Sequence, residues 1–148
     1  MILDSNQKGN LTEMQCMAAF MANGYTISIP YGDNAKYDFI ADVDGKLLKI
    51  QVKTAFVKKQ DDTSIHFSCV STHINCKGAS NYKYSQSDID FFATYWNDNC
   101  YIVPITECST GKTLRLVPPK NGQTKGIAFA EHYLLEIQLT NLKAKNLL

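Results

Sequence analysis

Hydrophobic and polar residues alternate most clearly on either side of the dipeptide Asp44-Gly45. Residues 39–43 and 47–52 each carry apolar side chains at alternate positions, which is the pattern of a half-buried strand. Asp-Gly between two such runs is a strong signal for a two-residue hairpin turn. We therefore expect these residues to form a β-hairpin with one apolar face.

The other segments show weaker patterns. From Leu11 to Asn23 apolar residues recur every three or four positions, which predicts an amphipathic helix that ends at Gly24. Short β-branched or aromatic runs predict further strands at 25–29, 63–70, 91–96, 101–105 and 113–117. The polar stretch 71–87 is expected to be a long exposed loop with one short helical turn. Residues 128–142 fit neither the helical nor the strand period cleanly and could form either.

Composition limits the possible classes of protein. A chain of 148 residues with 45% hydrophobic residues suits a single domain, here residues 1–148. Fifteen basic and fourteen acidic residues leave a net charge of +1, so any nucleic-acid surface must be local. No apolar run reaches the roughly 18 residues that span a bilayer, and the amino terminus has no secretory pattern. Five cysteines without a CxxC pair favour free thiols in a reducing cytoplasm.

The predicted turn fixes which residues face each other in the hairpin. Extending the pairing from the turn places Asp38 directly opposite Gln51. Lys53 lies two residues beyond Gln51 and so shares its face of the strand. Because the apolar residues occupy the other face, the register is supported independently of any function. The sequence therefore predicts a polar cluster of Asp38, Gln51 and Lys53 at the open end of the hairpin.

This cluster suits a hard cation such as Mg²⁺. Asp38, the side-chain oxygen of Gln51 and the backbone carbonyl of Val52 are the kinds of ligand that Mg²⁺ accepts in proteins. Such an ion activates water and stabilises charge on a phosphodiester, and Lys53 would orient or deprotonate that water. Glu13, on the polar side of the first helix, would add a carboxylate if the helix packs over the hairpin.

The order of Glu13 on a helix, then Asp38, then Gln51-Val52-Lys53 resembles the PD-(D/E)XK nucleases. Within that superfamily the chain looks most like the bacterial homing endonucleases encoded by group I introns, mainly over residues 9–55 and more loosely over 87–104. The resemblance implies a mixed α/β restriction-endonuclease-like fold, in which helices flank a mixed β-sheet.

The resemblance also implies the chemistry. Asp38 and Gln51 would be metal ligands, Lys53 the catalytic lysine and Glu13 an auxiliary acid, with Mg²⁺ as cofactor and Mn²⁺ as a substitute. The expected reaction is hydrolysis of double-stranded DNA that leaves 5′ phosphates, in a bacterial cytoplasm. Tyr37 and Gln51 depart from the motif, which has proline and an acid there. Gln51 removes one negative charge, which implies a weaker metal site, a single metal or an inactive site, although similar nucleases use glutamine at this position.

Candidate DNA contacts follow the hairpin and the segment after it. Lysines that track a phosphate backbone are expected at Lys46, Lys49, Lys58 and Lys59. Polar residues that suit base reading are His66, Ser68, Ser71, Thr72, Asn75, Lys77, Asn81 and Lys83. Ordinary solvation of an edge strand and a loop explains both groups equally well. One site cuts one strand, so a dimer or tetramer is expected, with the aromatic run 91–101 as its interface.

Several alternatives stay open. A Holliday junction resolvase, or a repair or restriction nuclease of the same superfamily, would share the site. A DNA-binding protein with a decayed site is motivated by Gln51, and a solvated Asp–Gln pair needs no function at all. Cys69, His73 and Cys76 have a spacing that suits zinc but lack a fourth ligand in register.

Overall fold

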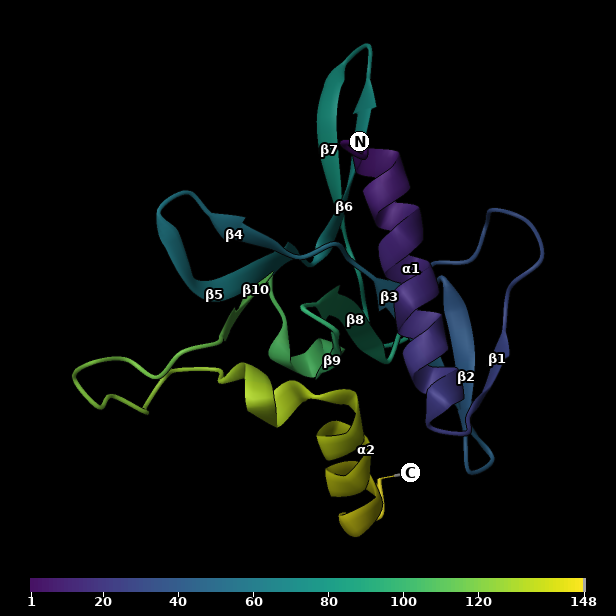
Figure 1. The fold of residues 1–148 in the computed structure, drawn as a ribbon. Coiled ribbons are helices and arrows are strands. Elements are labelled where there is room, and N and C mark those ends of the chain that lie inside the picture. Colours follow the sequence, from purple (N-terminus) through teal and green to yellow (C-terminus); the bar gives the residue numbers. More distant parts are fainter. Residues whose placement is uncertain (148) are drawn as a thin grey trace.

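The computed structural model describes residues 1–147 and, within them, arranges ten strands in three sheets with two α-helices (Figure 1). The helices are α1 (Ser5–Ala22) and α2 (Leu135–Ala144), with short 3-10 turns η1 (Ile105–Glu107) and η2 (Ala130–Tyr133). No helix of this part of the chain is long and apolar enough to cross a membrane.

The central sheet has the strand order β1-β2-β3-β8-β9. Its strands are β1 (Thr26–Ser28), β2 (Phe39–Val43), β3 (Lys46–Val52), β8 (Phe91–Trp96) and β9 (Asn99–Pro104). Only β3 and β8 pair in parallel, so the sheet is mixed. The pairing of Phe39 with Ile50 and of Val43 with Lys46 confirms the predicted register of the β2–β3 hairpin.

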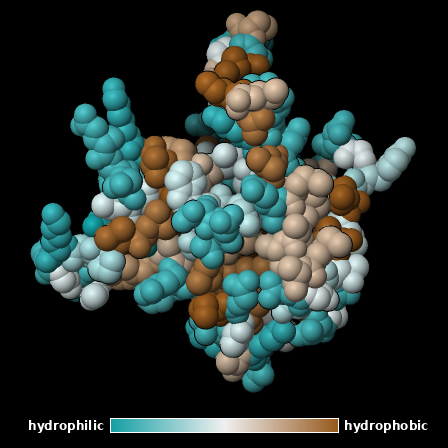
Figure 2. Space-filling model, in the orientation of Figure 1, coloured by the Kyte–Doolittle hydropathy of each residue, from teal (hydrophilic) through white to brown (hydrophobic). Residues whose placement is uncertain are grey.

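Two smaller sheets complete the fold. One has the order β10-β5-β4, formed by β10 (Gly111–Arg115), β5 (Asp61–Ser68) and β4 (Phe56–Lys58). The other is the hairpin of β6 (Val70–Asn75) and β7 (Gly78–Lys83), which projects beside the amino-terminal end of α1 (Figure 1). Figure 2 shows this hairpin standing clear of the body of the molecule.

Each face of the central sheet has its own core. On one face, Cys16 and Phe20 of α1 pack against buried residues of β2, β3 and β8, and Leu135 and Leu139 of α2 join them. On the other face, Phe92 packs with buried residues of the sheet that contains β5 and β10. The central sheet is therefore covered by helices on one side and by strands on the other.

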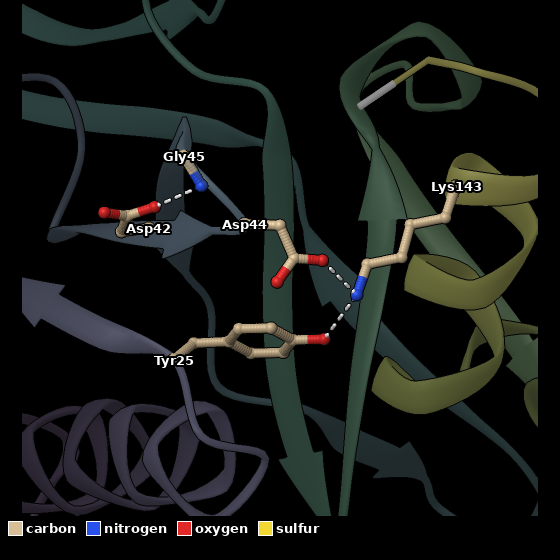
Figure 3. Close-up of polar contacts among 5 residues, drawn as sticks. All are labelled: Tyr25, Asp42, Asp44, Gly45 and Lys143. Atoms are coloured by element: carbon tan, nitrogen blue, oxygen red, sulfur yellow. Dashed lines mark hydrogen bonds and ion pairs between the residues drawn. The ribbon is translucent and has the colours of Figure 1, made fainter.

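The turn of the β2–β3 hairpin has the geometry that its sequence predicts. Asp44 and Gly45 have φ angles of 53° and 89°, as a type I′ turn requires. Asp42 accepts a hydrogen bond from the Gly45 N–H at 2.8 Å. Lys143 of α2 reaches the Asp44 carboxylate at 2.6 Å and donates to the Tyr25 hydroxyl at 3.2 Å (Figure 3). These contacts fasten the carboxy-terminal helix to the turn end of the hairpin.

The first helix begins earlier than its apolar pattern predicts. Asp4 accepts a hydrogen bond from the Gln7 N–H at 2.8 Å, and the Asp4 N–H donates to the Gln7 side chain at 3.0 Å. This capping box starts the helix at Ser5. The predicted start at Leu11 is wrong because residues 5–10 are polar on all sides.

The structure differs from the sequence-based expectations at three other places. The segment 71–87 is mostly not a loop, because it forms the β6–β7 hairpin, closed by a turn after Asn75. The segment 128–142, whose pattern fits neither period cleanly, is largely helical. Within the run 91–101, the expected subunit interface, Phe91, Phe92 and Tyr101 are buried within this chain. These three are core residues and offer no apolar surface to a partner, whereas Tyr95 and Trp96 are half-buried.

Candidate active site

Asp38 is fixed at the open end of the β2–β3 hairpin by backbone contacts. Its N–H donates to the Ile50 carbonyl at 2.8 Å, which continues the pairing of the two strands beyond Phe39. Its carboxylate accepts a hydrogen bond from the Val52 N–H at 2.8 Å. The hairpin therefore holds the Asp38 carboxylate across from the end of β3, where Gln51 lies.

Asp38 and Gln51 lie between two polar cavities. The larger, of about 490 Å³, opens toward α1 and is lined by Ser5, Asn6, Gly9, Asn10, Glu13, Asp38, Gln51, Val52 and Thr54. The smaller, of about 210 Å³, opens toward the β6–β7 hairpin and is lined in part by Ser71, His73, Tyr82 and Tyr84. A ligand in either cavity would meet the Asp38 carboxylate and the Gln51 amide.

Glu13 brings a second carboxylate to the larger cavity. It lies on α1, which packs on the apolar face of the hairpin, and it lines this cavity together with Asp38. Burial raises the pKa of Glu13 above its ordinary value, and the negative charge of Asp38 raises it further. The structure therefore brings Glu13, Asp38 and Gln51 together, as the sequence predicted.

The carboxyl group of Asp38 is half-buried, and burial raises its pKa above the usual value of 3.8. The Val52 N–H and the ammonium of Lys53 act in the opposite direction, because both stabilise the charged form. A carboxylate that is partly desolvated and faces a second acid gains most from a nearby cation.

Lys53 directly follows β3, and hydrogen bonds hold both its backbone and its side chain. Its N–H donates to the Ala93 carbonyl of β8 at 2.9 Å, and its ammonium donates to the Val70 carbonyl of β6 at 2.9 Å. Burial lowers the pKa of Lys53, and the charge of Asp38 partly restores it. A lysine with a lowered pKa loses its proton more easily than an exposed one, which suits proton transfer.

The oxygen atoms of this cavity fit a divalent cation of the Mg²⁺ type. They come from two carboxylates, an amide and the backbone at Val52, which are hard ligands. Within residues 1–147 no three His, Cys, Asp or Glu side chains gather as a metal site, so an ion in this cavity would need the Gln51 amide or the backbone as well as the two carboxylates. Cys69 is buried in the core while Cys76 is exposed beside the hairpin turn, so the predicted zinc spacing is not assembled.

The candidate DNA-contacting residues divide by position. Lys46 lies at the turn end of the hairpin and donates to the Leu147 carbonyl at 3.1 Å, away from Asp38 at the open end. Lys49 is engaged with the Ser87 carbonyl. His66 is only 9% exposed, and its Nδ1 lies 2.8 Å from the Thr113 hydroxyl. These three side chains are less available to DNA than the sequence suggested.

The remaining candidates are more accessible. Lys58 and Lys59 are exposed around the turn between β4 and β5, where hydrophilic side chains project in Figure 2. Ser68 is exposed at the end of β5. The others belong to the β6–β7 hairpin, where Ser71 is half-buried. The exposed candidates there are Thr72, Asn75, Lys77, Asn81 and Lys83. The hairpin thus presents a polar ribbon next to the cavity.

Sequence reasoning missed the face of α1 that lines the larger cavity. Asn6, Gly9, Asn10 and Glu13 recur at helical spacing, so the signal was present once the helix was known to begin at Ser5. It also missed Tyr84, whose approach to the cavity depends on the unpredicted hairpin.

Comparisons with known proteins bear on the family and the fold. A family model described as PD-(D/E)XK endonuclease matches residues 3–136. Protein 5.3 of Escherichia phage T7 is 29% identical over 119 residues, which cover 80% of this chain and 92% of the phage protein. The solved structure of a bacterial homing endonuclease, I-Ssp6803I, is similar with a TM-score of 0.79, covering 97% of each chain at 20% identity. This similarity confirms the predicted restriction-endonuclease-like fold.

Proposed function

Because the chain belongs to the PD-(D/E)XK endonuclease family, we propose that it is a Mg²⁺-dependent endonuclease that hydrolyses phosphodiester bonds of double-stranded DNA. The observation that carries the proposal is the meeting of Glu13, Asp38 and Gln51 in one cavity, with Lys53 beside Asp38. Glu13 lies on α1, Asp38 directly precedes β2 and Gln51 lies on β3, so these residues lie together only in the folded chain.

The residues that would hold the ion are Asp38, Gln51 and the backbone carbonyl of Val52, with Glu13 as an additional acid. When bound, a divalent ion lowers the pKa of water and stabilises negative charge on a phosphate. The neutral Gln51 amide supplies an oxygen without a charge, so the carboxylates of Asp38 and Glu13 provide the electrostatic attraction.

Lys53 acts on the attacking water in this proposal. Its side chain lies on the Asp38 side of the hairpin. There the neutral amine would orient the water and accept its proton, or the ammonium would neutralise the charge that develops on the phosphate. Attack of water on phosphorus breaks the bond to the 3′ oxygen and leaves a 5′ phosphate and a 3′ hydroxyl. Mn²⁺ is expected to replace Mg²⁺, since both accept oxygen ligands.

The β6–β7 hairpin is the proposed DNA-reading element. Its exposed side chains offer hydrogen-bond donors and acceptors on a two-stranded ribbon, and a ribbon of this kind fits a major groove. Lys58 and Lys59 extend the positive surface at the neighbouring turn. Cleavage at one long target, as in homing, is supported by the fold that the chain shares with a homing endonuclease over nearly its whole length.

One cavity holds one set of catalytic groups, so a double-strand break requires two copies of the chain. We propose a dimer or tetramer for this reason. Because Phe91, Phe92 and Tyr101 are buried in the core, the contact between copies must use residues other than these three.

The deciding experiment is incubation of the purified chain with supercoiled plasmid. Nicked and linear DNA should appear with Mg²⁺ and not with EDTA, and Lys53→Ala should lower the rate by at least about 10²-fold. Lys125→Ala, at an exposed lysine that lines neither cavity, is the matched control and should leave the rate within about threefold. DNA binding without any metal-dependent nicking would refute the enzyme and favour a binding protein.

The substrate class is tested in the same preparation. A single cleavage position in a plasmid that carries a candidate target would support site-specific cutting. Cleavage of four-way junctions regardless of sequence would instead identify a resolvase.

Gly9 provides a second prediction about DNA. Glycine inside a helix costs about 1 kcal/mol relative to alanine, yet a Cβ at Gly9 would meet nothing within 4 Å in the chain. Gly9 lines the larger cavity, so the space is available to the DNA backbone. Gly9→Ala should therefore raise the melting temperature by about 3 °C and weaken DNA cleavage by about tenfold, measured by calorimetry and by the plasmid assay.

The control for this prediction is Ala18→Gly, at an exposed position on the same helix. It should lower the melting temperature by a similar amount and leave cleavage unchanged. A Gly9→Ala variant that is more stable and cuts DNA as fast as the wild type would show that DNA does not approach α1 at this point.

A further inference from the structure

The ammonium of Lys53 has an unusual set of partners for a charged group. It donates to the Val70 carbonyl at 2.9 Å and lies 5.3 Å from the centroid of the Tyr84 ring. Within the described residues no carboxylate oxygen lies within 4.0 Å of it. Asp38 acts on it through charge at a longer distance. Its position is therefore set by a carbonyl dipole and an aromatic ring.

The Tyr84 ring is itself fixed by other rings. Phe92 meets it edge-on, with centroids 5.4 Å apart and an interplanar angle of 89°. Tyr82 meets it in the same manner at 5.7 Å and 85°. Phe92 is 1% exposed and belongs to the core below the cavity. These two ring contacts therefore restrict the movement of the Tyr84 ring against which the Lys53 ammonium lies.

Val70 and Tyr84 come from the two ends of one element. Val70 is the first residue of β6, and Tyr84 directly follows the last residue of β7. The Lys53 ammonium therefore lies at the base of this hairpin and contacts both of its ends. Tyr84 also lines the smaller cavity with Asp38 and Gln51.

We propose that Tyr84 is a positioning residue that holds the Lys53 ammonium beside Asp38 through the face of its ring, with the Val70 carbonyl as the second support. The inference rests on the proposed nuclease function for its consequence, because a positioned lysine matters only where it acts on the attacking water. A cation over an aromatic face is attracted by the electrons of the ring. The hydroxyl of Tyr84 has no part in this contact, so phenylalanine serves in its place.

The contact is tested first by NMR of the chain labelled at lysine side chains, without DNA or metal. In the wild type the ε-methylene protons of Lys53 should be shifted upfield by the ring, and their order parameter should exceed that of exposed lysines. Tyr84→Phe should keep both properties and Tyr84→Leu should lose both. A wild-type Lys53 that is unshifted and as mobile as an exposed lysine overturns the proposal even if Tyr84→Leu fails to fold.

The consequence is tested by cleavage kinetics. Tyr84→Leu should lower kcat about fivefold to tenfold with KM changed by less than about twofold, and Tyr84→Phe should restore the wild-type rate. Tyr133→Leu is the matched control. The ammonium of Lys112 lies over the Tyr133 ring at the same distance of 5.3 Å from the centroid, and this pair lines neither cavity. It should leave kcat and the Lys53 signals unchanged.

Equal rates for wild type and Tyr84→Leu, or equal losses in Tyr84→Leu and Tyr84→Phe, would overturn the proposed role of the ring. A wild-type chain that leaves DNA uncut would instead refute the nuclease function. The NMR comparison would still decide whether Tyr84 positions Lys53.

Discussion

Replacing Asp38 by asparagine will abolish DNA cleavage and at the same time make the folded chain more stable. Cleavage should fall by at least about 10³-fold, because the variant loses the carboxylate that attracts the divalent ion and faces Lys53. Stability should rise because the charged carboxyl group is half-buried, whereas the amide carries no charge. Asparagine keeps an oxygen that accepts the Val52 N–H, so the hairpin end should stay intact.

The raised pKa of Asp38 determines the direction in which its contribution to stability changes with pH. The pKa of Asp38 is raised above 3.8 in the folded chain because burial penalises the charged form. The folded state therefore holds the proton more tightly than the unfolded chain does. The contribution of Asp38 to stability is fully present below pH 3.8 and is lost as the pH rises through the raised pKa.

It follows that Asp38→Asn and the wild type should be equally stable in acid, and that the variant should become the more stable of the two toward neutral pH. Urea unfolding of both proteins across the acid-to-neutral range measures the difference. Asp42→Asn is the matched control. Asp42 lies at the turn end of β2, the strand that follows Asp38, and its replacement should leave cleavage unchanged. A variant less stable than the wild type at neutral pH would show that contacts with the carboxylate outweigh its burial.

Phe20→Ala should lower the free energy of unfolding by about 3–5 kcal/mol, the range for removing a fully buried aromatic side chain. Phe20 is fully buried and packs edge-on against Phe39 with centroids 5.4 Å apart. This contact joins α1 to β2. A loss of this size is a large part of the total stability of a small domain, so the variant should be partly unfolded at physiological temperature.

The measurement is chemical unfolding followed by circular dichroism. Met14→Ala on the same helix is the control, because Met14 is 64% exposed and should change the free energy of unfolding by less than about 0.5 kcal/mol. A change below about 1 kcal/mol for Phe20→Ala would contradict the packing of α1 on the hairpin.

Both predictions reflect how the candidate site is built. Burial raises the pKa values of Glu13 and Asp38 and lowers that of Lys53. The surroundings of each group in the folded chain therefore disfavour its charged form, which opposes folding wherever the group is charged. The two apolar cores supply the stability that keeps these charges together, which is the usual relation between activity and stability in enzymes.

The sequence predicted the β2–β3 hairpin well because its two signals are local. Alternation along each strand and the Asp44-Gly45 turn lie within 15 residues and agree with each other, so the register followed and with it the pairing around Asp38 and Gln51. The family and the fold could be predicted from the same few residues.

The β6–β7 hairpin could not be predicted from the sequence, for a physical reason. Both faces of its outer half are exposed, so burial imposes no alternation on the sequence. Its formation depends on local contacts such as the hydrogen bond from the Thr72 hydroxyl to the Asn81 side chain at 2.9 Å. Tyr84 was missed with it, because its approach to Lys53 is a tertiary contact that neither residue signals in the sequence.

The parallel pairing of β3 with β8 has a consequence for when the chain becomes competent during synthesis. Glu13, Asp38, Gln51 and Lys53 all precede residue 54, yet the backbone of Lys53 is held by Ala93 of β8. A ribosome-bound chain that has exposed only the hairpin therefore carries every reactive group without the strand that aligns the lysine. The chain should acquire its chemistry late, after this non-local pairing has closed.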